Sequence, residues 1–125
     1  MRLLADENAF KLLTGSTSDY RLKEDAQEFS GLDLVNRIQV YDYAWKADGN
    51  REYGVMAHEL QAELPYLVTG KKDEVDENGQ PHIQRVNYAK LVPVLLRAIQ
   101  EQQEMISELR EQVETIKQAT TDTAL

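Results

Sequence analysis

From Tyr88 onward the chain consists of strong helix formers whose apolar residues recur at alternating steps of four and three. The recurring positions, of which the third and the last hold polar residues, are Leu95, Ile99, Gln102, Ile106, Leu109, Val113, Ile116 and Thr120. This heptad spacing is typical of the narrow seam of a coiled coil, rather than of a helix lying along its own core. Because such a seam is buried only against other helices, the spacing predicts a coiled-coil helix over 91–120, with a disordered tail over 121–125.

The composition of this seam favours three strands. With Ile99, Ile106 and Val113 at the a positions, the d positions are Leu95, Gln102, Leu109 and Ile116. The layers of Ile99 and Leu109 alone favour a dimer, but the isoleucine at the last d position and apolar Ala98 and Met105 at g widen the seam toward a homotrimer. Gln102 is the polar residue of the seam. It either fixes register and strand number or is a tolerated, surface-like glutamine.

The segment 19–90 mixes helix, strand and turn signals and predicts a small α+β body. Leu32, Val35 and Ile38 follow helical spacing, and strand formers occupy 40–45. Gly49 lies in a strong turn sequence, so a hairpin back through the residues after it is expected.

The second half of this body is predicted to be a short helix and a polar hairpin. Leu60, Leu64 and Leu67 share one helical face, and Pro65 is expected to end or bend that helix. The charged run after Gly70 predicts a hairpin that returns with a strand near Tyr88. The start of the long helix, 91–96, is too densely apolar for a seam alone, so we expect it to pack on this body. Six aromatic residues are expected to build the core, namely Tyr41, Tyr43, Trp45, Tyr53, Tyr66 and Tyr88, with Trp45 buried there. The alternative is that a subset of the six is exposed.

Charge and composition exclude several classes of function. The formal net charge of −8 argues against a nucleic-acid or anionic-membrane partner, because the basic residues are outnumbered and unclustered. The absence of cysteine excludes disulfides, thiolate metal sites and cysteine nucleophiles. No apolar run is long enough to span a bilayer. His58 and His82 are far apart in sequence, and the acidic run near Asp76 lacks the order of a calcium loop, so we expect neither a metal site nor a cofactor.

Residues 1–18 are predicted to be a leader, either a linker or the end of a segment that precedes the body. The leader meets the body at the stretch TSDYRLKED, where Ser18 precedes Lys23 by five residues. A serine becomes a nucleophile when a base takes its proton, and a lysine is such a base only where burial or positive charge lowers its pKa. From the pattern alone, this pair is either a nucleophile with its base or an ordinary polar loop. Asp19 could orient either partner and Arg21 could add positive field, or both could be solvated charges.

Several motifs together resemble the peptidase S74 family of phage tailspikes, tail fibres and neck appendages. The motifs are SDYRLKED, VYDYAWK, YGVMAHELQAELPYLV, VNYAKLVPVLLRAIQ and the terminal coiled coil. The resemblance covers Ser18 to about Gln118, and His58 stands where a glutamine is expected in related sequences.

The resemblance implies an intramolecular chaperone that trimerises, assists folding of the β-rich fibre preceding it in the same polypeptide, and releases itself by cleavage at a serine. By motif matching, Ser18 is the nucleophile and Lys23 the base. Assembly is expected in the host cell cytoplasm, with release from the mature fibre after cleavage. The alternative is a non-catalytic trimerisation module, in which Ser18 and Lys23 are loop residues.

Two geometric points bear on such a cleavage. In a strand, residues five apart lie about 16 Å apart on opposite faces, so Lys23 reaches Ser18 only through a bend or from a neighbouring subunit. Attack by the Ser18 hydroxyl on the carbonyl of Thr17 passes through a five-membered ring, whereas attack on its own carbonyl needs a strained four-membered one. We therefore predict scission of Thr17-Ser18. Scission of Ser18-Asp19 is the alternative if another chain supplies the nucleophile.

Overall fold

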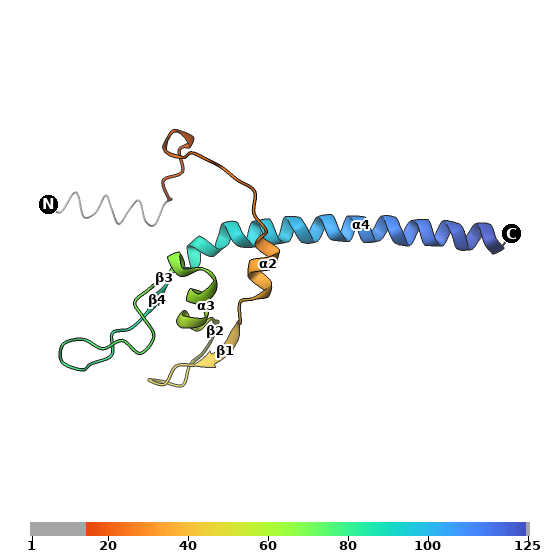
Figure 1. The fold of residues 1–125 in the computed structure, drawn as a ribbon. Helices are drawn as coiled ribbons and strands as arrows, with labels where there is room; N and C mark the ends of the chain where they lie inside the picture. Colours follow the sequence, from red (N-terminus) through yellow and green to blue (C-terminus); the bar gives the residue numbers. More distant parts are fainter. Residues whose placement is uncertain (1–14, 125) are drawn as a thin grey trace.

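The predicted coiled-coil segment is one long helix, α4 (Val92–Ala124), in the computed structural model, which describes residues 15–124 (Figure 1). A 3-10 turn, η3 (Tyr88–Leu91), leads into it. The helix continues past the predicted end at 120 to Ala124, and the hydroxyls of Thr121 and Thr123 donate to the carbonyls of Lys117 and Ala119 one turn earlier. Residues 121–124 are therefore helical, where a disordered tail was expected.

The first half of the body follows the predicted order of helix, strand and hairpin. Helix α2 (Gly31–Asn36) begins after Ser30, whose hydroxyl accepts a hydrogen bond from a first-turn amide. Strands β1 (Tyr41–Ala44) and β2 (Arg51–Gly54) pair antiparallel, with Tyr41 opposite Gly54. Gly49 in the turn has a φ of 75°, which glycine adopts at no steric cost.

The second half is a short helix and a sparse hairpin. Helix α3 (Ala57–Glu63) stops just before Pro65, which opens the 3-10 turn η2 (Pro65–Leu67), as predicted. Strand β3 (Val68–Thr69) pairs antiparallel with β4 (Arg85–Val86), and the polar segment between them forms the predicted hairpin. The mixed α+β body is confirmed. No helix among residues 15–124 is both long enough and apolar enough to cross a membrane.

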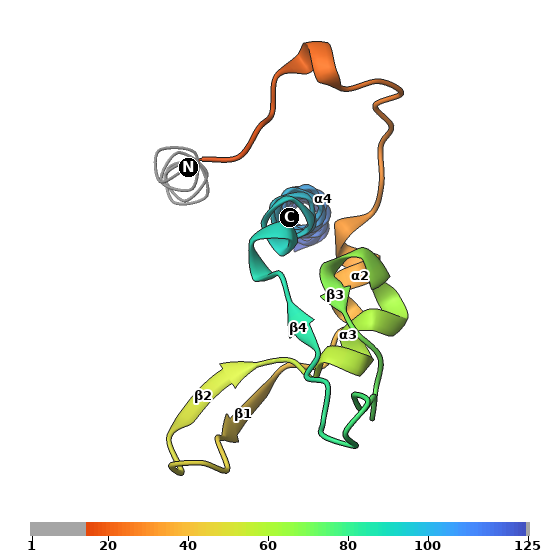
Figure 2. The same cartoon turned by 90° about the vertical axis from the view of Figure 1, so that its left-hand side faces the viewer.

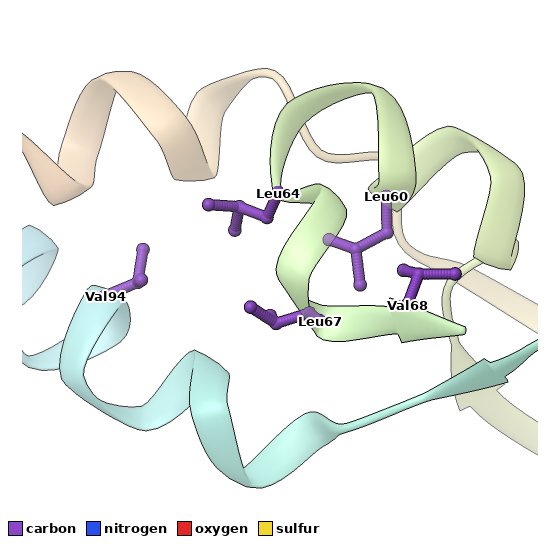
Figure 3. Packing of buried hydrophobic residues seen from close by; sticks show 5 residues of the cluster. All are labelled: Leu60, Leu64, Leu67, Val68 and Val94. Atoms are coloured by element: carbon purple, nitrogen blue, oxygen red, sulfur yellow. The ribbon is translucent and has the colours of Figure 1, made fainter.

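The core of the body is a small aliphatic cluster contributed by α3, η2, β3 and α4 (Figure 3). Its buried members are Leu60, Leu64, Leu67, Val68 and Val94. The three leucines predicted to share a face are all buried, and Val94 shows that the start of α4 packs on the body as expected. This contact joins the two parts of the chain.

The prediction that Trp45 and the tyrosines build the core is wrong. Trp45 is 51% exposed. Strands β1 and β2 form a two-stranded sheet of their own, and Tyr41 reaches the body from it, where its hydroxyl donates to Glu59 of α3. Trp45 stands edge-on to Tyr43 at 5.2 Å between ring centroids, and its ring nitrogen donates to Glu52. Tyr53, Tyr66 and Tyr88 are exposed as well.

Helix α2 crosses α4 at a point where only a glycine fits. A Cβ added to Gly31 would lie 2.3 Å from the carbonyl oxygen of Val94 and 2.7 Å from the amide nitrogen of Ala98. Both are backbone atoms of α4, which cannot move aside singly. Ala98 is only 4% exposed because this crossing covers it, so it does not widen the coiled-coil seam as the sequence suggested.

The view along α4 shows how the chain is arranged around this helix (Figure 2). The body lies on one side of α4. The segment before α2 passes beside α4, so residues near Tyr20 lie on the side of the helix opposite to β1 and β2 (Figures 1 and 2).

The crossing predicts that Gly31→Ala destabilises the fold. An added methyl in a filled contact typically costs about 1–3 kcal/mol, so the urea midpoint should fall at fixed protein concentration. Gly15→Ala is the matched control, since no atom lies within 4 Å of the Cβ it would add. An unchanged midpoint for Gly31→Ala would show that the α2–α4 crossing does not support the fold.

Candidate active site

The structure brings Ser18 and Lys23 together within one chain. Lys23 Nζ lies 2.5 Å from Ser18 Oγ and donates a hydrogen bond to it. The bend that makes this possible is a 3-10 turn, η1 (Tyr20–Leu22). Because this turn shortens the path between residues that would otherwise be extended, no neighbouring subunit is needed for the contact itself.

Asp19 and Arg21 stabilise this turn. The Asp19 carboxylate accepts from the amide of Arg21 at 2.9 Å and caps the turn. It also accepts from Nε and Nη2 of the Arg21 side chain at 3.0 and 2.8 Å. The side-chain hydrogen bond from Arg21, followed by its backbone amide, lowers the pKa of Asp19 below its ordinary value. Arg21 thus pairs with Asp19 within the turn.

The pair stands in solvent in a single chain. Ser18 and Lys23 are exposed, and the two apolar residues of the turn, Tyr20 and Leu22, are 82% and 74% exposed. A lysine acts as a base toward serine only where burial or nearby positive charge lowers its pKa. The geometry of a dyad is therefore present in one chain, whereas the desolvation that would activate it is not.

An extended segment, which we call the strap (residues 23–29), connects this turn to α2. The strap is exposed, and Asp25 adopts a left-handed φ of 52° with its carboxylate accepting from Gln27. Within residues 15–124, the hydrogen bonds of residues 15–28 are all local, and none joins them to another element. The position of the turn therefore depends on where the strap is attached.

The strap is attached to α4 by Glu101 and Arg97, in a set of contacts that we call the clamp. Arg97 Nε donates to the carbonyl of Phe29 at 3.1 Å. The Glu101 carboxylate accepts from the Ser30 hydroxyl and from the Gly31 amide, both at 2.7 Å. These contacts place a negative charge at the amino end of α2, where the helix favours it.

The clamp also sets the protonation of Glu101. The hydrogen bond from the Ser30 hydroxyl, then the amides of α2 and the nearby guanidinium of Arg97, lower the pKa of Glu101, against the opposing effect of burial. Sequence reasoning missed this residue. Glu101 falls outside the a and d positions, and its partner Ser30 lies 71 residues earlier in the chain.

The predicted seam residues lie in solvent along α4. Ile99, Leu109 and Ile116 are 62%, 58% and 64% exposed. Leu95, Ile106 and Val113 are between 43% and 48% exposed, and Gln102 is exposed beside them. The single chain thus presents an uncovered apolar stripe beyond the body.

The histidines form no shared site. His82 pairs with Glu74 across the β3–β4 hairpin, and His58 is exposed on α3. Among the described residues, no group of three potential metal-ligating side chains is close enough to hold an ion.

Comparison with known proteins identifies the segment that begins at Ser18. Residues 18–69 match the family model Peptidase_S74, described as Chaperone of endosialidase. The chain is also 29% identical over 110 residues to the Long tail fiber protein Gp37 of Salmonella phage S16. That alignment covers 81% of this chain and 14% of the fibre protein, so the chain spans only a small part of this relative's length.

The Glu101 contacts predict a pH-dependent contribution to stability. Because its pKa is lowered by folding, the stabilisation is fully present above its ordinary value of 4.5 and is lost as pH falls through the folded value. Glu101→Gln should therefore lower the urea midpoint at neutral pH. The difference in urea midpoint between this variant and the wild type should shrink below about pH 4.5. A gap that stays constant down to about pH 3 would contradict an ionised Glu101 at this contact.

Proposed function

We propose that this chain, which carries a Peptidase S74 segment over residues 18–69, is the intramolecular chaperone of a phage tail fibre that trimerises and then releases itself by cleavage at Ser18. The observation that carries this proposal is the hydrogen bond between Lys23 Nζ and Ser18 Oγ, at the first residue of the family match. The partner is the fibre segment preceding it in the same polypeptide, folded in the host cytoplasm. The second candidate is a trimerisation module without catalysis.

The uncovered stripe of α4 supports the trimer. The helix has 33 residues, which at 1.5 Å per residue is a rod of about 50 Å, and only its first turns contact the body. Beyond Glu101, burial of Ile106, Leu109 and Ile116 requires other helices, because their own chain does not cover them. Three copies of the same stripe provide that cover.

We expect Leu109→Ala combined with Ile116→Ala to dissociate the trimer. Truncating a buried leucine or isoleucine typically costs about 2–5 kcal/mol per site, and the double variant removes two layers from all three helices. Sedimentation equilibrium measures the outcome.

The matched control replaces Glu104 and Glu111 by alanine, since these residues lie on the outer face of the proposed coiled coil. That control should remain trimeric. A stable trimer of the seam variant would defeat the assignment of these residues to the seam.

The cleavage is proposed to proceed through an ester. Ser18 Oγ attacks the carbonyl carbon of Thr17 while Lys23 Nζ takes the hydroxyl proton. The bond from this carbon to the Ser18 nitrogen then breaks, and the nitrogen receives the proton. Water hydrolyses the ester, which restores the Ser18 hydroxyl and leaves a carboxylate on Thr17. No co-reactant other than water is consumed.

Exposure of the pair supports a requirement for assembly. A single chain leaves Lys23 exposed to solvent, whereas a lysine becomes a base where burial disfavours its charged form. Tyr20 and Leu22 flank the pair with apolar area, and a neighbouring chain that buried them would exclude water there as well. Cleavage would then follow trimerisation.

We expect Ser18→Ala, Lys23→Ala and Lys23→Arg each to abolish cleavage and to leave the trimer intact. The arginine variant fails because its guanidinium stays protonated and cannot act as a base. The readout is a denaturing gel and intact mass, which report loss of residues 1–17 over time.

Two controls sharpen this test. Ser16→Ala removes a neighbouring exposed hydroxyl and should cut normally. The seam variant, with Ser18 and Lys23 untouched, should remain uncut if assembly activates the pair. Processing of Ser18→Ala would exclude Ser18 as the nucleophile. A folded wild-type trimer that never cuts would favour the non-catalytic module.

A further inference from the structure

The turn η1, which we call the processing turn, is attached to the rest of the described chain through the strap and the clamp. The strap and the turn make only local hydrogen bonds until Phe29, where Arg97 binds the carbonyl, and Ser30, where Glu101 binds the hydroxyl. Among the described residues, hydrogen bonds to another element hold this segment only at its carboxyl end. Any freedom at Phe29 and Ser30 therefore becomes positional freedom of Ser18 and Lys23.

The clamp lies on the turns of α4 that begin the seam. Arg97 and Glu101 alternate along the helix with Leu95, Ile99 and Gln102, which the seam uses. Residues this close in number share the same two turns of helix. Packing of the seam at this level orders the backbone that carries the clamp.

The clamp is also better shielded than the turn it supports. The side chain of Glu101 is 15% exposed and that of Arg97 is 32% exposed, and the two charges lie 3.6 Å apart. One carboxylate accepts the Ser30 hydroxyl and the Gly31 amide, with the Leu32 amide at 3.4 Å. Hydrogen bonds to a charged group are shorter and stronger than those between neutral groups, so this contact fixes the direction in which the chain enters α2.

We infer that Glu101 is a positioning residue for self-cleavage: through Ser30 and Gly31 it holds the strap on the first seam turns of α4, so that registration of the three helices places Ser18 and Lys23 where a neighbouring chain covers them. This inference rests on the proposed function. Glu101 contacts neither reacting residue. Its effect is on where they lie.

The test measures the cleavage rate of variants that are shown to be folded and trimeric by circular dichroism and sedimentation. Glu101→Ala should slow loss of residues 1–17 by roughly 10- to 100-fold, because small misplacements of reacting groups have effects of that order. Glu101→Gln should restore most of the rate, since its amide oxygen still accepts from Gly31.

Arg37→Ala is the matched control, because it breaks the exposed pair between α2 and Glu63 at 2.8 Å and leaves the clamp intact. It should cut at the wild-type rate. If Arg37→Ala slowed cleavage as much as Glu101→Ala at equal stability, the effect would be structural and the inference would be wrong. A trimeric Glu101→Ala that cuts at the wild-type rate would overturn it too.

A second variant covers the case in which Glu101→Ala does not trimerise. Arg97→Met keeps the stem that packs beside Gly31 and removes the donor to Phe29. It should cut more slowly than wild type, and wild-type cleavage by this trimer would refute the clamp's role. Ser18→Ala tests the proposed function by itself: if this variant still cuts, Ser18 is not the nucleophile. If Ser18→Ala does not cut but the clamp variants cut at the wild-type rate, the proposed function stands and the inference about the clamp is wrong.

Discussion

The contact between α2 and α4 is the constraint on which the other features of this structure depend. It joins two parts of the chain that differ in kind, a small aliphatic body and a long helix whose stripe is uncovered. Close approach at Gly31 lets the backbones meet, and the carboxylate of Glu101 satisfies the amides that this meeting would otherwise leave unpaired. The core contact at Val94 follows from the same crossing. Without the contact between α2 and α4, no other element among the described residues would hold the carboxyl end of the strap in place.

This arrangement separates geometry from activation. The turn capped by Asp19 holds Lys23 against Ser18 in one chain, yet it leaves both side chains in water. Under the proposed function, a monomer therefore carries an inactive pair, and the missing element is cover from another chain. A chaperone that cut itself free before its fibre had registered would be of no use, and an exposed pair avoids that outcome.

The sequence predicted those features that depend on local pattern. The long C-terminal helix, the leucine face that includes Leu60, the proline after α3 and the turn at Gly49 all depend on patterns of nearby residues, and each is found where expected. Trp45 was misplaced because strand propensity says nothing about whether a second layer covers the ribbon. Glu101 was missed because a charge outside the seam positions of a helix is indistinguishable from a solvated one until its distant partner is known. The contact of Ser18 with Lys23 needed a bend whose cap, Asp19, is visible in sequence only as one acidic residue among many.

The central claim is that completed assembly and self-cleavage occur together. Native mass spectrometry of the purified wild-type protein tests it most directly, since one spectrum gives both the number of chains and the mass of each. The account predicts a complex of three chains, each beginning at Ser18 and lacking residues 1–17. A stable trimer of intact chains of 125 residues, or cleaved chains that remain monomeric, would contradict it.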